Sequence, residues 1–351
     1  MILMILMIYL LIIIFILFVF YISHILFQPR EHMSMKNREL QKTFEENGLN
    51  IDFETYTIQK CDADHKCFSK QYSTLYFNTM ESHYLAKNKP SSNSIFQKNQ
   101  IPVPPHWIID QHNKQYYIED FPIFFPCVLK PVDGMQGKDV YTHIQNKKQY
   151  KDILITLLEK YNQLMLEKQV YGKNYRIFVF NNQIMDIVTR EQPFVVGNGI
   201  YTIEELIDRQ NKQLIEKNRF PTTNIDWTYI EEQGYTKTKI LEKDKSIFIT
   251  HTINFHNGAQ PFRLDIHKVP RINQDIFIKA HQLIGLECSG IDYMSPDIYV
   301  PYTENNGHII EINSMVDTYI HSQTDANDSS FLFRNIATSL QTSFPPISGI
   351  S

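Results

Sequence analysis

Apolar residues are concentrated at the start of the chain. Residues 1–28 carry no charged side chain, and Met1–Ile22 is an unbroken run of apolar and aromatic residues. A helix of this length extends about 33 Å and matches the roughly 30 Å hydrocarbon core of a bilayer. The pattern therefore predicts a membrane-spanning helix over residues 1–28. A cleaved signal peptide is the alternative, but the segment lacks the basic start and the small-residue cleavage site of such a peptide.

The basic residues around this segment indicate its orientation. None precedes it, whereas Arg30, Lys36, Arg38 and Lys42 follow it closely. Because cytoplasmic flanks of membrane helices are enriched in Lys and Arg, we expect a single-pass membrane protein whose remaining residues face the cytoplasm.

The rest of the chain shows short periodic stretches. Residues 29–87 suggest a polar juxtamembrane segment and a small strand-bearing element, 88–328 a main domain, and 329–351 a C-terminal helix and tail. Helical periodicity covers 147–160, 202–211 and 275–285, and strand-like runs cover 163–170, 176–180, 183–188, 289–294 and 308–312. Strands and helices interleave without a regular βαβ period, which predicts an α+β fold.

Composition excludes several classes of protein. The 351 residues include 34 Lys and Arg against 38 Asp and Glu, a net charge of −4, so we expect no nucleic-acid partner. Two of the four cysteines, Cys127 and Cys288, are isolated and suggest buried apolar positions. Cys61 and Cys67 are close enough in sequence to pair or to share a metal, although their spacing matches no common zinc pattern.

One loop has the composition of a phosphate-binding site. An apolar run ends at Lys130 and leads into a loop that includes Asp133, Gly134 and Gly137. An ammonium group followed by exposed backbone N–H groups suits a polyphosphate. A surface turn with a solvated lysine is the alternative for this stretch taken alone.

Three polar residues near the C-terminus interrupt apolar strands. Asp292 follows Ile291, and Glu311 and Asn313 flank Ile312. Residues two apart on a strand share a face, so the last two side chains point the same way. With Asp292 on a neighbouring strand they would form an all-oxygen Mg²⁺ site, with Mn²⁺ as a possible substitute. Two solvated strand faces are the alternative.

Taken in order, these and other short motifs resemble the ATP-grasp superfamily, and in particular the ATP-grasp modules of cyanophycin synthetase and of bifunctional glutamate–cysteine ligase/glutathione synthetase. The resemblance extends from about Asn88 to Pro346 and includes Ile101-Pro102-Val103-Pro104, Glu167…Gly172…Arg176, Arg190…Gly197…Gly199, Gly290-Ile291-Asp292, Glu311-Ile312-Asn313 and a trailing His321. It implies two α+β lobes that clasp ATP.

The resemblance also implies roles for individual residues. Nucleotide binding is implied for Lys89, Lys130, Asp133, Gly134, Gly137, Glu167, Lys168, Val170 and Asn174. Mg²⁺ binding is implied for Asp292, Glu311 and Asn313, and contact with the reacting acyl group for Arg176 and Arg190. The implied function is an ATP-dependent carboxylate–amine ligase that forms an amide through an acyl phosphate, acting on small carboxylate and amine substrates such as an amino acid or a short peptide.

Several positions depart from the family pattern. Asn174 stands in place of an acidic residue, Asn198 in place of an aspartate, Asp139 in place of a loop glycine, and Val316-Asp317 in place of Pro-Gly. These departures keep two other hypotheses open, namely a non-catalytic, membrane-tethered nucleotide-binding module and a ligase that modifies a protein or peptide terminus.

Overall fold

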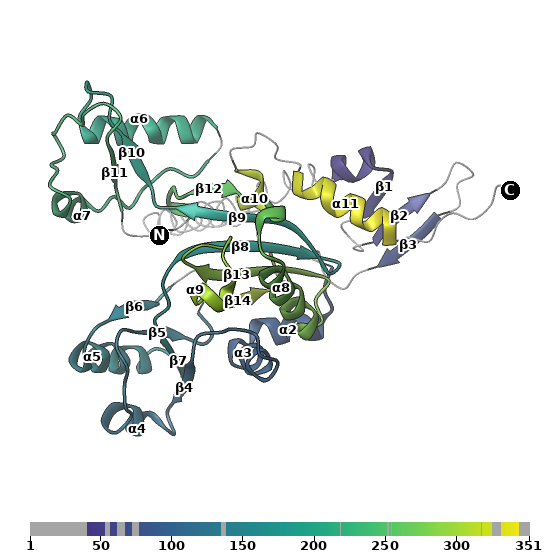
Figure 1. Ribbon diagram of the computed structural model, residues 1–351, viewed down its shortest axis with the longest axis horizontal. Coiled ribbons are helices and arrows are strands. Elements are labelled where there is room, and N and C mark those ends of the chain that lie inside the picture. The colour runs from purple at the N-terminus through teal and green to yellow at the C-terminus, as the bar shows by residue number, and fades with distance from the viewer. Residues whose placement is uncertain are drawn as a thin grey trace, which may run out of the picture. The chain divides into compact units, whose positions relative to one another are not determined.

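The computed structural model describes residues 41–52, 57–61, 67–71, 77–134, 138–217, 219–250, 253, 255–316, 318–324 and 331–343 (Figure 1). The predicted membrane helix over residues 1–28 and the loop residue Gly137 lie outside these ranges. Of the helices in the described ranges, none combines the length and apolar character needed to cross a bilayer.

The chain divides into two compact units, of which the smaller comprises residues 1–71 and 333–351. Its described part contains an antiparallel sheet of β1 (Leu49–Asp52), β2 (Thr57–Cys61) and β3 (Cys67–Gln71), together with most of α11 (Phe331–Ser343). Cys61 lies opposite Cys67 in the register of β2 and β3. This register leaves open both roles predicted for the two cysteines.

The larger unit, residues 72–332, begins with a helical pair and a four-stranded sheet. The helices are α2 (Met80–Lys87) and α3 (Lys89–Lys98). The sheet has the order β4-β7-β5-β6, with strands His106–Asp110, Gln163–Lys168, Cys127–Pro131 and Tyr141–Ile144. Its core residues, among them Leu129 and Leu166, pack against Tyr150 and Leu154 of α5 (Lys147–Leu158). Tyr117 of α4 (Lys114–Glu119) belongs to the same hydrophobic core.

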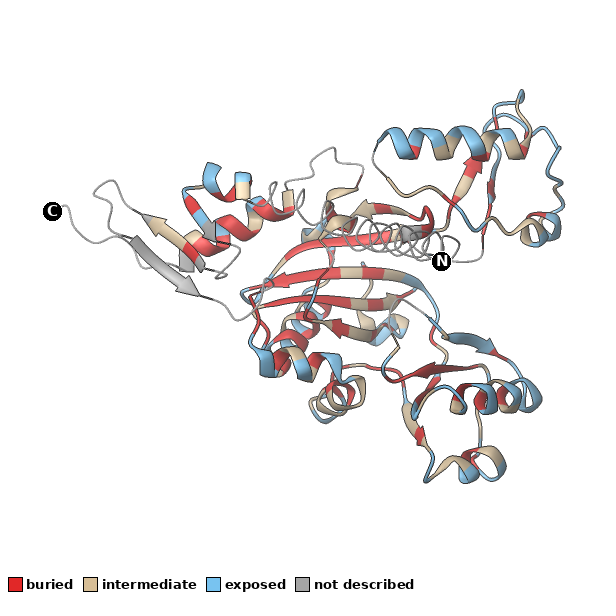
Figure 2. Ribbon diagram, turned by 180° about the vertical axis from the view of Figure 1, so that it is seen from behind, coloured by how far each residue is buried: buried red, intermediate tan, exposed pale blue. Residues whose placement is uncertain are grey.

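A five-stranded antiparallel sheet carries the predicted metal ligands and both predicted catalytic arginines. Its order is β12-β9-β8-β13-β14, with strands Gln260–Arg263, Gln183–Glu191, Lys173–Phe180, Cys288–Ser295 and His308–Asn313. Tyr175, Ile177 and Ile291 point toward α8 (Arg271–Ile284), where Phe277 and Ala280 complete the core. The central strands are buried along most of their length (Figure 2). Because side chains alternate along a strand, the polar residues between these core positions lie on the opposite face.

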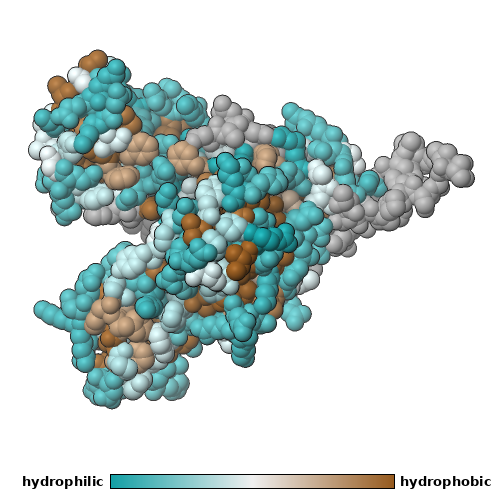
Figure 3. Space-filling view, viewed as in Figure 1, coloured by the Kyte–Doolittle hydropathy of each residue, from teal (hydrophilic) through white to brown (hydrophobic). Residues whose placement is uncertain are grey.

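A smaller subdomain is inserted between β9 and β12. It pairs β10 (Phe194–Val196) with β11 (Ser246–Phe248) and adds α6 (Ile203–Glu216) and α7 (Trp227–Glu232). A capping box of Thr202 and Glu205 starts α6, because the two residues satisfy each other's backbone N–H groups. Apolar residues on the face shown in Figure 3 form scattered patches in a largely hydrophilic surface, as is normal for a folded protein.

The remaining short elements connect these parts. They are the 3₁₀ turns Phe255–Asn257 and Ile266–Lys268 and the helices α9 (Tyr302–Asn305) and α10 (Tyr319–Ser322). The mixed α+β architecture predicted from the sequence is confirmed. The sequence analysis missed α2, whose apolar stripe is weak: only Ser82 and Ala86 are buried, and the helix begins instead at the Thr79 cap.

The core also contains a histidine that should make stability depend on pH. His281 is fully buried on α8, with Nδ1 2.8 Å from Ser289 Oγ, and burial lowers its pKa from 6.5 to about 4. Between these values the unfolded chain binds a proton that the folded chain excludes, so stability falls as the pH falls. We expect a loss of up to about 3 kcal/mol from this residue between pH 7 and pH 4.

His281→Gln should therefore flatten the pH dependence of the free energy of unfolding across this window, measured by urea denaturation. His112→Gln, at an exposed position, is the matched control and should leave the wild-type slope unchanged. Equal slopes in all three proteins would contradict the assignment.

Candidate active site

A buried ion pair lies at the centre of the four-stranded sheet. Lys130 Nζ on β5 lies 2.7 Å from Glu167 Oε2 on β7, and the two side chains are only 10% and 5% exposed. The register pairs Val128 with Glu167, which makes Lys130 the diagonal neighbour on the same face. Glu167 Oε1 is buried and accepts no hydrogen bond from the described residues. The pair therefore offers one free acceptor to a ligand.

Lys89 connects the predicted phosphate loop to the predicted metal site. It is the first residue of α3, where its Nζ donates to the backbone carbonyl of Gly134 at 2.9 Å and lies 3.6 Å from Glu311 Oε2. Asp133, before Gly134, is exposed. Two segments that lie far apart in the sequence thus meet at one ammonium group, which suits a site for phosphates.

The far end of this loop is fixed by Asp139. Its backbone has a φ of +54°, a left-handed value that a glycine would adopt without strain. Its carboxylate accepts a 2.5 Å hydrogen bond from Tyr161 Oη, whose pKa this bond raises. The replacement of a loop glycine by aspartate is therefore accommodated, because Asp and Asn tolerate this conformation better than other residues.

Two arginines and a carboxylate meet on the open face of the five-stranded sheet. Arg176 on β8 is directly opposite Asp292 on β13, and its Nη1 donates to Asp292 Oδ2 at 3.0 Å. Arg190 on β9 lies 3.7 Å from Asp292 Oδ1 and also donates to Asn174 Oδ1. Asn174, predicted to reach a ribose, is thus held by Arg190 in this structure.

Gly290 makes room for this cluster. A Cβ atom added at Gly290 would lie 2.9 Å from Val316 Cγ1, closer than real Cβ contacts come, and 3.3 Å from Arg176 Nη1, which is a tight contact. A side chain here would require Val316 to move and would crowd Arg176, which pairs with Asp292 two residues further along the same face of β13.

Glu311 and Asn313 complete the cluster from β14. Glu311 is opposite Asp292 in the register, and Asn313 is opposite Gly290. In the amide orientation that satisfies both groups, Asn313 donates to Glu311 Oε1 at 2.8 Å and accepts from Arg176 Nη1 at 2.9 Å. Burial raises the pKa of Glu311 and is the largest influence on it, whereas Lys89 lowers it. The ionised carboxylate is therefore favoured by a further cation nearby.

The donor set of this cluster fits Mg²⁺. Two carboxylates and an amide supply only oxygen ligands, which a hard cation prefers. Asp292 Oδ1 is buried and accepts no hydrogen bond from the described residues, so it retains a free lone pair. Within the described ranges no three His, Cys, Asp or Glu side chains gather as metal ligands, so a zinc-type site is not found there.

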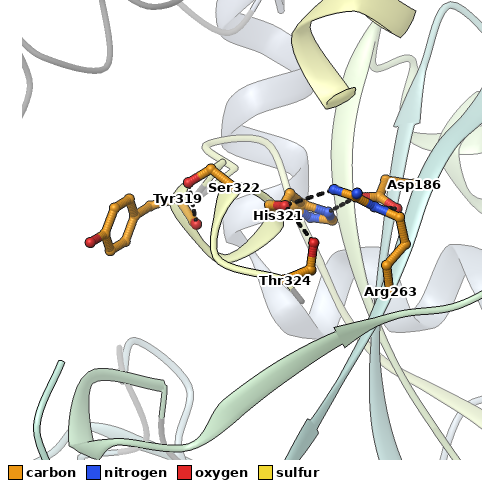
Figure 4. A network of polar contacts seen from close by, with 6 residues as sticks. All are labelled: Asp186, Arg263, Tyr319, His321, Ser322 and Thr324. Carbon is orange, nitrogen blue, oxygen red and sulfur yellow. Dashed lines mark hydrogen bonds and ion pairs between the residues drawn. The ribbon is translucent and has the colours of Figure 1, made fainter. Parts of the chain in front are cut away.

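A second polar network lies on the same sheet and includes His321 (Figure 4). Asp186 on β9 accepts from Arg263 Nε at 3.1 Å and lies 3.0 Å from Nδ1 of His321 on α10. Arg263 also donates to the backbone carbonyl of His321 at 2.9 Å. Asp186 and His321 are fully buried, so this network fastens α10 to β9 and β12.

The remaining predicted nucleotide-binding residues follow the ion pair along the chain. Lys168 is exposed at the end of β7, with its backbone N–H bonded to Pro105, and Val170 is buried two residues later. The structure thus brings together most predicted residues in two groups, one on each sheet, with Lys89 linked to both the loop and Glu311. Asn78 was not predicted from the sequence; its side chain contacts Cys288 at the start of β13 and Ser314 directly after β14. Its position beside the Thr79 helix cap was the available signal.

Comparison with known proteins shows which family and fold the chain resembles. Residues 86–194, which include Lys89, Lys130, Glu167, Arg176 and Arg190, match the family described as the RimK-like ATP-grasp domain. This segment of the chain is similar to an ATP-grasp domain. The resemblance seen in the sequence is confirmed, and with it the α+β ATP-grasp fold.

The relatives of this ATP-grasp domain are ligases much longer than the chain. Over 271 residues it is 28% identical to cyanophycin synthetase of Geminocystis herdmanii, which covers 72% of the chain and 29% of the relative. It is 24% identical over 249 residues to the glutathione biosynthesis bifunctional protein GshAB of Clostridium perfringens, covering 68% and 32%. The chain therefore spans about a third or less of the length of these relatives.

A solved structure shares the fold. The bifunctional glutathione synthetase of Pasteurella multocida superposes with a TM-score of 0.61 at 18% identity, covering 84% of the chain and 42% of that protein. At this level of identity the likeness concerns the fold alone.

The Lys130–Glu167 pair can be tested for its effects on folding stability and on nucleotide binding. Lys130→Met would leave the buried Glu167 without a counter-charge, so we expect it to lower the free energy of unfolding by about 3–5 kcal/mol. Adding Glu167→Gln should restore most of this stability without restoring nucleotide binding. Urea denaturation and nucleotide titration measure the two effects.

Lys160→Met is the matched control for this pair. It breaks a 3.9 Å contact to Asp139 in which the lysine is 54% exposed, and should change stability by no more than about 1 kcal/mol. A Lys130→Met protein as stable as the control would show that the buried pair does not matter for folding.

Proposed function

We propose that this protein is an ATP-dependent, ADP-forming carboxylate–amine ligase. The observation that carries the proposal is the cluster on the open sheet face, where Asp292 and Glu311 stand opposite one another beside Arg176 and Arg190. A set of two acidic oxygen ligands next to two cations suits a reaction that brings together nucleotide phosphates, a metal and a substrate carboxylate.

The nucleotide is proposed to bind between the polar residues of the four-stranded sheet and those of the five-stranded sheet. Lys130 and Lys89 supply positive charge for the phosphates, and the loop that starts at Asp133 and Gly134 supplies backbone N–H groups. Glu167 Oε1, buried without a hydrogen bond from the described residues, is available to accept from an amino group of the base. Val170 would provide an apolar contact to the base, and the backbone of Lys168 would lie next to this contact.

Mg²⁺ would be held by Asp292, Glu311 and Asn313. When bound there, it would offset the negative charge of the phosphates in the transition state. The raised pKa of Glu311 and the free lone pair of Asp292 Oδ1 support this role.

The chain's own residues would then guide two bond-forming steps. A carboxylate oxygen of the substrate attacks the γ-phosphorus of ATP and releases ADP, which gives an acyl phosphate. The amine nitrogen attacks the acyl carbon, phosphate leaves, and the nitrogen loses a proton. Arg176 and Arg190 would orient the carboxylate and stabilise the oxyanion of the tetrahedral intermediate.

Small amino acid or short peptide substrates are the class proposed here. The names of the relatives, cyanophycin synthetase and a glutathione biosynthesis protein, support an amide product built from amino acids. In a variant of this proposal the acceptor is a protein or peptide terminus, and the substrate test below also addresses this variant. The non-catalytic alternative loses part of its support, because Asp139 is accommodated by its hydrogen bond to Tyr161.

The apolar run Met1–Ile22 supports a further part of the proposal, a membrane tether with the ATP-grasp domain on the cytoplasmic side. A tether would confine the ligase to a surface without changing its chemistry.

The ligase proposal predicts that ADP release requires a carboxylate and an amine together. The full chain with Mg²⁺ and ATP would be assayed against a matrix of amino acids and dipeptides in both roles. Glu311→Ala should lower the rate about a hundredfold or more, because a metal ligand contributes several kcal/mol to the transition state. Glu304→Ala, at an exposed acidic position, should retain the wild-type rate.

Two outcomes would contradict this proposal. Full activity in Glu311→Ala would remove the metal assignment. ATP binding without ADP release, for every small pair and for peptide termini, would favour a non-catalytic nucleotide-binding module.

The tether predicts where the chain is found after cell lysis. The full chain should sediment with membranes and resist a carbonate wash, whereas a chain that starts at residue 29 should stay in the supernatant. Ile13→Arg, which places a charge in the middle of the apolar run, should weaken membrane retention because such a charge costs about 3 kcal/mol in a bilayer. A full chain in the supernatant would contradict the tether.

A further inference from the structure

Asn78 joins the two strands that carry the predicted metal ligands. It precedes α2 and is only 2% exposed. Its Nδ2 donates to the carbonyls of Cys288 and Ser314, each at 2.8 Å, and its Oδ1 accepts from the N–H groups of Glu287 and Cys288 at 2.9 and 3.0 Å. One side-chain amide therefore bridges the start of β13 and the end of β14.

This bridge lies where the regular ladder between the two strands stops. The last register pair is Gly290 with Asn313, and Ser314 follows directly. His83, one turn into α2, adds a 2.8 Å contact from Nδ1 to Ser314 Oγ. Asn78 and His83 thus continue the strand pairing with side chains, immediately beyond the predicted ligand Asn313.

The register of β13 and β14 needs such support because it is irregular beside the ligands. Asp292 pairs with Glu311, but the next residue, Tyr293, pairs with Ile309, so Ile310 is an extra residue in β14. A bulge of this kind weakens the ladder locally. A slip by one residue would turn Glu311 and Asn313 toward the opposite face, away from Asp292.

From these contacts we propose that Asn78 is a positioning residue for the metal site, supported by His83: it fixes the β13–β14 register and thereby the spacing of Asp292, Glu311 and Asn313. This inference rests on the proposed function for the identity of the site. It assigns a role in metal binding to a helix-capping segment more than two hundred residues away in sequence.

Mn²⁺ binding tests this role without relying on turnover. The full chain would be titrated with Mn²⁺ in the presence of ADP, and free Mn²⁺ followed by electron paramagnetic resonance. Asn78→Ala should bind Mn²⁺ about 10–100-fold more weakly, the usual effect of removing a residue that orients metal ligands. Metal-free ADP binding, measured by calorimetry in EDTA, should be unchanged.

Asn273→Ala is the matched control. Asn273 is fully buried on α8, and its side-chain amide bonds to the backbone in a similar way. Its Nδ2 donates to the carbonyls of Ile298 and Val300, and its Oδ1 accepts from the N–H group of Tyr302. It holds the connection between β13 and β14, at the end away from Asn313. We expect this variant to lose stability but to keep the wild-type affinity for Mn²⁺.

The outcomes separate this inference from the proposed function. If the wild-type chain binds no Mn²⁺ with ADP, the metal site itself is wrong and the inference is overturned with it. If the wild type binds Mn²⁺ but Asn78→Ala and Asn273→Ala are equally affected, only the positioning role is overturned.

His83→Ala decides the question if Asn78→Ala does not fold. It removes one contact at the surface side of the same bridge and should weaken Mn²⁺ binding in the same direction, with metal-free ADP binding retained. Unchanged Mn²⁺ affinity in a folded His83→Ala protein would then overturn the inference.

Discussion

The antiparallel pairing of β8, β13 and β14 is the constraint on which the site depends. It sets Arg176, Asp292 and Glu311 side by side across three strands. Because alternate residues of β8 and β13 pack against α8, a change of register would expose core residues such as Ile177 and Ile291 to water. The apolar face of the sheet thus specifies the geometry of its polar face.

The same constraint explains where small residues are needed. Gly290 leaves space between Arg176 and Val316, and a side chain there would require Val316 to move and would crowd the arginine. Asp292 itself accepts from Arg176 and lies near Arg190, so its position is fixed from two strands. Close packing and charge pairing therefore act on the same few atoms, and neither alone accounts for the cluster.

Local sequence signals were sufficient for much of the fold but for less of the site. The periodicity that predicted helices near 147–160 and 275–285 depends on neighbours a few residues apart, and α5 and α8 are found there. The ordered motifs indicated which residues matter. They could not predict the contacts of Asn78 with Cys288 and Ser314 or the hydrogen bond between Asp139 and Tyr161, because such contacts depend on how distant segments meet.

Three carboxylates of the candidate site each already have a cationic neighbour. Glu167 pairs with Lys130, Glu311 lies near Lys89, and Asp292 lies between two arginines. Leaving a half-buried carboxylate unpaired would be costly, so these pairs stabilise the site before any ligand is present. Under the proposed function, nucleotide and metal binding would be an exchange of partners, in which the cations turn to phosphate and carboxylate groups of the substrates and the acidic residues turn to the metal. Such an exchange leaves the number of paired charges nearly constant, which keeps the cost of assembling so many charges in one place low.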